Sequence, residues 1–143
     1  MILRIAQSND LDSLLFIHKD TIGSSWSKTD FASAIAGKNN KIVFSVVEKE
    51  EIIGYIMVGI LPPEAEIINI AIIPNKQRKG YGSKAMELMF LELISRKVKI
   101  VFLEVREKST AVNYYLKNGF EAVGIRKQYY PDGENALRMQ KEL

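Results

Sequence analysis

The chain has 143 residues, 47% of them hydrophobic, with no cysteine and one histidine. This size is typical of a single folded domain with a buried core, so we expect one domain over residues 1–143. The lack of cysteine excludes disulfides, thiolate metal ligands and a cysteine nucleophile, and we expect no metal site. A net charge of +3 is too small to indicate nucleic-acid binding.

The N-terminal residues predict a strand followed by a helix. Residues 2–6 have the composition of a strand, and the apolar residues after them recur at helical spacing. This spacing places Leu11, Leu14, Leu15 and His18 on one face. His18 is a candidate general base, but its position on an apolar face favours a packed, neutral histidine.

The next segment predicts a helix and three strands. Ser27 with Asp30 three residues later resembles a helix cap and opens a short helix. Residues 41–47 and 52–61 predict a hairpin, and a strand over residues 66–73 follows.

A basic, glycine-containing turn comes next, with the sequence QRKGYG at residues 77–82. It leads into an amphipathic helix, where Gly80 and Gly82 let a ligand approach the backbone closely. The first amides of a helix lack internal partners and carry positive dipole charge, which suits a phosphate. Arg78 and Lys79 add positive charge, so the turn is interpreted as a diphosphate-binding loop.

Other interpretations of this turn are open. The nucleoside triphosphate loop GxxxxGK[ST] does not occur in the chain. A dinucleotide fingerprint is formally satisfied by Gly80, Gly82 and Ala85, with Glu104 as the downstream acid, but the glycines lie too far from the preceding strand. A helix entry without a ligand is the remaining alternative.

The C-terminal part predicts a parallel strand, a helix and a hairpin. The helix over residues 82–96 leads to an apolar strand over residues 98–105, which we expect to run parallel to the preceding strand and to be covered on both faces. A helix over residues 110–117 and a hairpin turning at residues 131–133 complete a mixed sheet flanked by helices.

Glu104 is the first candidate catalytic residue. It lies at the carboxyl end of its strand, where ligands enter parallel sheets, on the same face as Ile100 and Phe102. Desolvation by such neighbours makes a carboxylate a better proton acceptor. A strand-end glutamate paired with Arg106, Lys108 or Arg126 is the structural alternative.

Four segments together carry a resemblance to a known family. They are WSKTDF at residues 26–31, QRKGYGSKAMELM from Gln77, FLEVREKSTAVNYYLKNGF from Phe102 and YYPDGENALRM from Tyr129. They resemble the GCN5-related N-acetyltransferase (GNAT) superfamily, within it the RimI-type bacterial enzymes that acetylate the N-terminal alanine of a small-subunit ribosomal protein.

The resemblance implies a fold and a cosubstrate. The fold would be the α/β (α+β) GNAT fold, a mixed, mostly antiparallel sheet with a parallel pair at the cofactor site and about four helices. The cosubstrate would be acetyl coenzyme A. The residues implied to bind it are Ile70, Ala71, Ile72, Gln77, Arg78, Lys79, Gly80, Tyr81, Gly82, Ser83 and Ser109.

The resemblance also implies two catalytic residues. Glu104, in the string LEVR, would be the general base, directly or through a water. Tyr115, a few residues before Gly119 and Phe120, would donate a proton to the coenzyme A thiolate. Neighbouring helix positions point about 100° apart, so alignment from Gly119 selects Tyr115 over Tyr114.

One segment departs from the family pattern RxSNxxAxxLY. Residues 106–115 are one residue shorter and lack the asparagine that normally contacts the cofactor. The hydroxyl of Ser109 or the side chain of Asn113 is a candidate replacement.

The acceptor side is implied in the same way. Asn69, Trp26, Tyr129 and Tyr130 are the candidate residues for binding a protein N-terminus, although aromatic side chains equally pack a hairpin. A lysine or small-amine acetyltransferase and a catalytically silent acetyl coenzyme A sensor are the alternative functions. We expect a cytoplasmic protein, a monomer or weak homo-oligomer, with no nucleic-acid or membrane partner.

Overall fold

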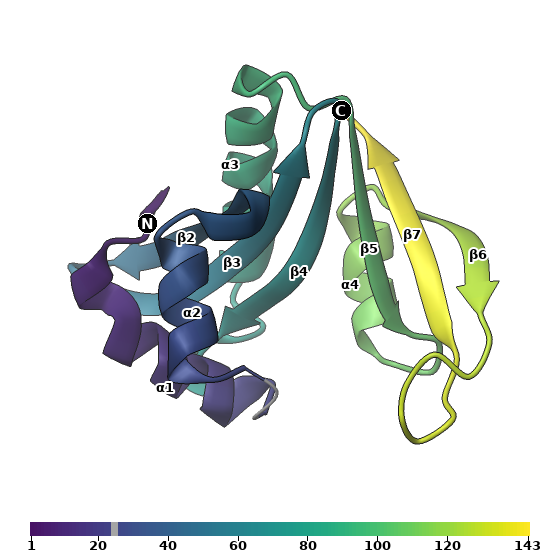
Figure 1. Ribbon diagram of the computed structural model, residues 1–143, viewed down its shortest axis with the longest axis horizontal. Helices are drawn as coiled ribbons and strands as arrows, with labels where there is room; N and C mark the ends of the chain where they lie inside the picture. The colour runs from purple at the N-terminus through teal and green to yellow at the C-terminus, as the bar shows by residue number, and fades with distance from the viewer. Residues whose placement is uncertain (24–25) are drawn as a thin grey trace.

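The computed structural model describes residues 1–23 and 26–143. Within them seven strands form one sheet in the order β1-β2-β3-β4-β5-β7-β6, flanked by four α-helices (Figure 1). The expected mixed sheet with about four helices is confirmed. The strands are β1 (Ile2–Ile5), β2 (Lys41–Glu48), β3 (Glu51–Leu61), β4 (Glu64–Ile72), β5 (Ile100–Arg106), β6 (Glu121–Arg126) and β7 (Ala136–Glu142). The α-helices are α1 (Leu11–Thr21), α2 (Lys28–Ile35), α3 (Tyr81–Ser95) and α4 (Ala111–Lys117), and short 3-10 helices cover Ser8–Asp10, Lys38–Asn40 and Pro74–Lys76.

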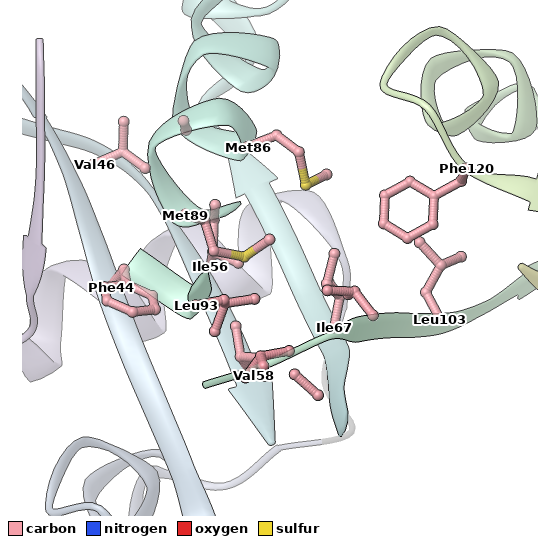
Figure 2. Packing of buried hydrophobic residues seen from close by; sticks show 14 of the residues in the cluster. Phe44, Val46, Ile56, Val58, Ile67, Met86, Met89, Leu93, Leu103 and Phe120 are labelled. Carbon is pink, nitrogen blue, oxygen red and sulfur yellow. The ribbon is translucent and has the colours of Figure 1, made fainter. Parts of the chain in front are cut away.

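The two faces of the sheet pack against different helices, as strand alternation requires. On one face Tyr55 and Met57 join a buried cluster with Leu14 of α1 and Phe31 of α2. On the other face a second cluster contains Ile56, Val58, Met86, Met89, Leu93, Leu103 and Phe120 (Figure 2). The amphipathic pattern of α3 is thus the pattern of a helix packed on one side of a sheet.

Local sequence signals were reliable at several boundaries. Ser27 caps α2, because its Oγ accepts from the Asp30 N–H at 3.1 Å while Asp30 accepts from the Ser27 N–H. The predicted hairpin of β2 and β3 is confirmed, with Glu48 paired to Glu51. No helix among the described residues is long and apolar enough to cross a membrane.

The strands β4 and β5 form the parallel pair predicted from the sequence, but they pair over a short stretch only. Residues 64–66 of β4 pair with residues 100–102 of β5. Beyond this stretch the two strands diverge (Figure 1). The register shifts between Met57 and Val58 of β3, which pair with Asn69 and Ile67, so Ile68 is an extra, bulged residue of β4, and a bulge bends the strand that carries it. The carboxyl half of β4 therefore borders an opening in the sheet.

Strand β5 differs from its prediction in two respects. It begins at Ile100 and not at Val98. The Val98 N–H donates to the Leu93 carbonyl at 3.1 Å, so this residue takes part in the hydrogen bonding that terminates α3. Only one of its faces is fully covered. Val101 and Leu103 are buried, whereas Phe102 on the opposite face is partly exposed.

Candidate active site

A cavity of about 420 Å³ lies between the carboxyl end of β4, the first turn of α3 and the helix α4. It brings together most of the residues expected to bind a cofactor. Its lining consists of Thr21, Ile22, Ile70, Ala71, Ile72, Gln77, Arg78, Gly80, Gly82, Ser83, Ala111, Tyr114 and Tyr115. Three segments far apart in the sequence therefore form one binding cavity. Thr21 and Ile22 carried no sequence signal, because only the packing of α1 brings them here.

The backbone of β4 offers donors on the open side of the sheet. The Ile73 N–H donates to the Ile53 carbonyl at 2.8 Å. Because hydrogen bonding alternates along an antiparallel strand, the amides of Ile70 and Ile72 point away from β3. The Ile72 carbonyl faces the same way and accepts from the Gln77 side-chain amide at 2.8 Å, which fixes the following turn.

The entrance of α3 has the features of an anion-binding turn. Gly80 caps the helix with a φ of 87°, and Arg78 before it has a φ of 59°, both in the left-handed region. The first intrahelical bond runs from the Lys84 N–H to the Gly80 carbonyl at 3.0 Å. The amides of residues 81–83 precede this bond, so they are available at the positive end of the helix dipole.

The two glycines of this turn have different roles. A side chain on Gly80 would meet nothing within 4 Å, so the space beside it is open, and its positive φ favours glycine. A Cβ on Gly82 would lie 3.1 Å from the Tyr114 hydroxyl. The space beside the Gly82 Cα is thus occupied by Tyr114, while Gly82 itself still lines the cavity.

Three residues expected at the cofactor do not line the cavity with their side chains. Tyr81 donates its hydroxyl hydrogen to Glu48 and lies 5.9 Å beneath the Lys76 ammonium, so its ring is held against β2. Ser109 accepts from the Ala111 N–H at 3.1 Å and thereby caps the start of α4. Lys79 is exposed.

Neither candidate replacement for the missing asparagine, Ser109 or Asn113, lies at the cavity. The Ser109 hydroxyl is engaged at the helix start, and Asn113 is exposed on α4. Neither side chain lines the cavity.

Tyr114 and Tyr115 both line the cavity. Their rings lie 5.2 Å apart with an interplanar angle of 64°. Burial raises the pKa of Tyr115 to about 12, and burial also raises the pKa of Tyr114. Both phenols therefore stay protonated near neutral pH and can act as hydrogen donors.

Glu104 is held by two arginines. Its Oε1 lies 3.1 Å from Nη1 of Arg138 and 3.2 Å from Nε of Arg126. Of the three pairings that the sequence left open, with Arg106, Lys108 or Arg126, the structure of the described residues shows the one with Arg126. Arg106 instead forms ion pairs with Asp132 at 2.8 Å and Glu134 at 2.7 Å.

The second carboxylate oxygen of Glu104 is different. Oε2 is buried and has no hydrogen-bond partner in the described part of the chain. The carboxylate therefore has one oxygen fixed by positive charge and one oxygen free to accept a hydrogen bond from a ligand. Sequence reasoning missed Arg138, which lies opposite Glu104 in the β5–β7 register.

The residues expected on the acceptor side occupy separate places. The Nδ2 of Asn69 is buried and finds no partner among residues 1–23 and 26–143. Tyr129 and Tyr130 lie edge to face with ring centres 5.1 Å apart. The Arg126 guanidinium, which pairs with Glu104, lies 5.8 Å from the Tyr129 ring, and the charge of Glu104 raises the pKa of Tyr129. Tyr130 lies 4.1 Å beneath the Arg106 guanidinium.

Trp26 does not line the main cavity. The centre of its ring lies 6.1 Å from that of Phe31 and 6.0 Å from the Lys41 ammonium. It borders a separate hollow between α2 and the start of β2.

His18 is a packed side chain, as predicted. It is buried, its Nδ1 lies 2.7 Å from the Tyr55 hydroxyl, and burial lowers its pKa.

Comparison with known proteins identifies the family. Residues 10–120 match the Acetyltransferase (GNAT) family. The chain belongs to the GNAT acetyltransferases. Among relatives of this GNAT chain, a ribosomal protein bS18-alanine N-acetyltransferase of Haemophilus influenzae is 37% identical over 110 residues, covering 71% of this chain and 75% of that protein. The corresponding protein of Escherichia coli K12 is 31% identical over 137 residues, covering 93% and 91%.

A solved structure of a related enzyme supports the same family assignment. The crystal structure of the ribosomal-protein-S18-alanine N-acetyltransferase from Escherichia coli superposes with a TM-score of 0.88 at 29% identity, covering 99% of this chain and 92% of that one. The fold, the family and the N-acetyltransferase activity predicted from the sequence motifs are thereby confirmed.

GNAT acetyltransferases use acetyl coenzyme A, and the cavity fits this cosubstrate. The open amides at residues 81–83 and the charge of Arg78 suit a diphosphate. The free amides of Ile70 and Ile72 suit the amide-containing arm. When bound, the thioester supplies an activated acetyl group.

Proposed function

We propose that this GNAT acetyltransferase transfers the acetyl group of acetyl coenzyme A to the N-terminal α-amino group of a ribosomal protein whose first residue is alanine. The observation that carries the proposal is the likeness to ribosomal protein bS18-alanine N-acetyltransferases, at 31% identity over 93% of the chain in one case. A ribosomal acceptor implies a cytoplasmic reaction.

Glu104 is proposed as the general base. Arg126 and Arg138 orient its carboxylate through Oε1, and the buried Oε2 has no partner in the described residues. Oε2 would take the proton of the ammonium, directly or through a water. An α-amine has a pKa near 8, against about 10.4 for lysine, so it costs less to deprotonate at neutral pH.

Tyr115 is proposed as the proton donor to the leaving thiolate. It lines the cavity, and burial raises its pKa to about 12, so the phenol holds its proton at neutral pH. A thiolate that leaves into such an enclosed site needs a donor, because its charge has little water to solvate it. The amides of Ile70 and Ile72 would hold the thioester carbonyl and the adjoining arm.

The acceptor peptide is proposed to lie beside Glu104. Tyr129 is near the Glu104 carboxylate, and the buried Nδ2 of Asn69 has no partner in the described residues and can donate to a peptide carbonyl. Tyr130 would wall this groove, held by the Arg106 guanidinium. Trp26, which borders a separate hollow beside α2, would contact only peptide residues beyond the first few.

A panel of acceptors tests the proposal. Peptides that begin with alanine, the same peptides with a blocked α-amine, free lysine and polyamines are assayed for coenzyme A release, and the modified atom is located by mass spectrometry. We expect acetylation of the free α-amine only. Activity on lysine or polyamines alone would overturn the peptide assignment, and tight cosubstrate binding without any transfer would indicate a sensor.

A further inference from the structure

The hydroxyl of Tyr114 is a buried donor that the reaction described above does not use. It has no hydrogen-bond partner in the part of the chain that the structure describes, although it belongs to a residue that lines the main cavity. It lies at the place where a side chain on Gly82 would project, 3.1 Å from that Cβ position. The hydroxyl thus sits against the first turn of α3, beside the open amides of residues 81–83.

The fold holds α4 at this position by specific contacts. Nδ2 of Asn118, at the end of α4, donates to the Tyr114 carbonyl at 2.8 Å and reaches the Ser83 hydroxyl at 3.3 Å. This side chain links the last turn of α4 to the first turn of α3. The Tyr114 ring is further held edge-on against Tyr115. The approach of the phenol to α3 is therefore determined by packing on both sides.

The chemistry of this place suits an anion. Burying a hydroxyl without a partner costs free energy, and a ligand oxygen would remove that cost. Burial raises the pKa of Tyr114, so its phenol remains a donor across the physiological range. The neighbouring donors are backbone amides at the positive end of a helix, which favour negative charge.

We propose that the Tyr114 hydroxyl is an additional cosubstrate-binding group that donates a hydrogen bond to the diphosphate of acetyl coenzyme A at the entrance of α3. This inference rests on the proposed function, because it takes acetyl coenzyme A as the ligand of the cavity. It gives the two adjacent tyrosines separate tasks. Tyr114 contributes to binding of the carrier, and Tyr115 contributes to the transfer step.

The test is isothermal titration of coenzyme A and of S-acetyl-pantetheine, which has no diphosphate, into wild type, Tyr114→Phe and Asn113→Ala. A hydrogen bond to a charged group accounts for about a 10- to 100-fold difference in affinity. We expect Tyr114→Phe to weaken coenzyme A binding by at least about tenfold and to leave S-acetyl-pantetheine binding within about twofold. The control Asn113→Ala, which changes an exposed side chain of the same helix outside the cavity lining, should bind coenzyme A like wild type.

The other outcomes overturn the inference. Unchanged coenzyme A affinity in Tyr114→Phe with a lower thermal midpoint would mean a purely structural tyrosine. An equal loss for both ligands would assign the hydroxyl to the pantetheine arm instead of the diphosphate. If the wild-type protein does not bind coenzyme A, the proposed function is overturned as well. If it binds coenzyme A tightly and Tyr114→Phe has no effect on that affinity, this inference alone is overturned.

Discussion

Arg138 of β7 lies directly opposite Glu104 of β5, with its Nη1 3.1 Å from the carboxylate Oε1. The same guanidinium lies 4.4 Å above the Phe102 ring, so its plane is held by a second contact. Arg126 reaches the same oxygen from β6. The closing hairpin therefore determines the position of the group proposed as general base.

Replacing Arg138 tests this positioning role. Arg138→Gln should lower kcat/KM by about tenfold, because Glu104 loses one of the two charges that orient it. The loss should appear in kcat and leave the affinity for coenzyme A unchanged, because Arg138 contacts the proposed base and does not line the cofactor cavity. Arg138→Lys, which keeps the charge but lacks the planar guanidinium, should restore part of the rate. An unchanged kcat in Arg138→Gln would contradict the positioning role.

The pKa of Tyr115 sets the behaviour at high pH. Because burial raises this pKa to about 12, the phenol keeps its proton well above neutrality. We expect kcat of wild type not to decline between pH 8 and 10. Tyr115→Phe should lower kcat by about 100-fold, the range typical of a lost general acid, with little change in coenzyme A affinity. A wild-type rate that falls through pH 9 would assign the proton donor to another group.

His18 predicts a pH-dependent stability. Burial lowers the pKa of His18 in the folded state. As the pH decreases through the unfolded-state value of about 6.5, the unfolded state therefore binds more protons than the folded state, and the free energy of unfolding decreases. The contribution of this single proton cannot exceed about 1.4 kcal/mol per pH unit. Thermal melts from pH 7.5 to 5 should show this loss in wild type and a flatter profile in His18→Gln. Equal slopes in the two proteins would contradict it.

The contact between Gly82 and Tyr114 predicts coupling between two substitutions. Gly82→Ala should destabilise wild type, because the new Cβ would come within 3.1 Å of the phenol oxygen. In Tyr114→Phe that oxygen is absent, and the nearest remaining ring atoms lie at ordinary contact distances of 3.5 and 3.6 Å. We expect a coupling free energy of unfolding of about 0.5–1 kcal/mol in a double-mutant cycle by urea denaturation.

Gly80→Ala is the control for that cycle. It should cost about 1 kcal/mol, because Gly80 has a φ of 87°. This cost should be the same with and without Tyr114→Phe, since nothing lies near the Gly80 Cβ position. Coupling of equal size for both glycines would show that the Gly82 contact is not its source.

The parts of the fold and site that depend on residues close together in the sequence could be predicted from the sequence. The Ser27 cap, the hairpin of β2 and β3 and the turn before α3 follow from short-range spacing. These features involve hydrogen bonds and dihedral angles within a few residues, which side-chain type largely determines.

Long-range pairings could not be predicted in the same way. The partner of Glu104 depends on the β5–β7 register, and a shift of one residue would remove Arg138 from that face. The occupation of the space at Gly82 depends on the packing of α4 against α3. Likewise, the position of Tyr81 against Glu48 depends on a strand more than thirty residues earlier in the chain.

The most direct test of the account is mass spectrometry of an alanine-initiated peptide incubated with acetyl coenzyme A and either wild type or Glu104→Gln. Wild type should acetylate the α-amine, and Glu104→Gln should be slower by about 100- to 10,000-fold while it binds coenzyme A with wild-type affinity. Glu121→Gln, an exposed glutamate on β6, serves as the matched control and should retain full activity. Undiminished α-amine acetylation by Glu104→Gln would contradict the assignment of Glu104 as the proton acceptor.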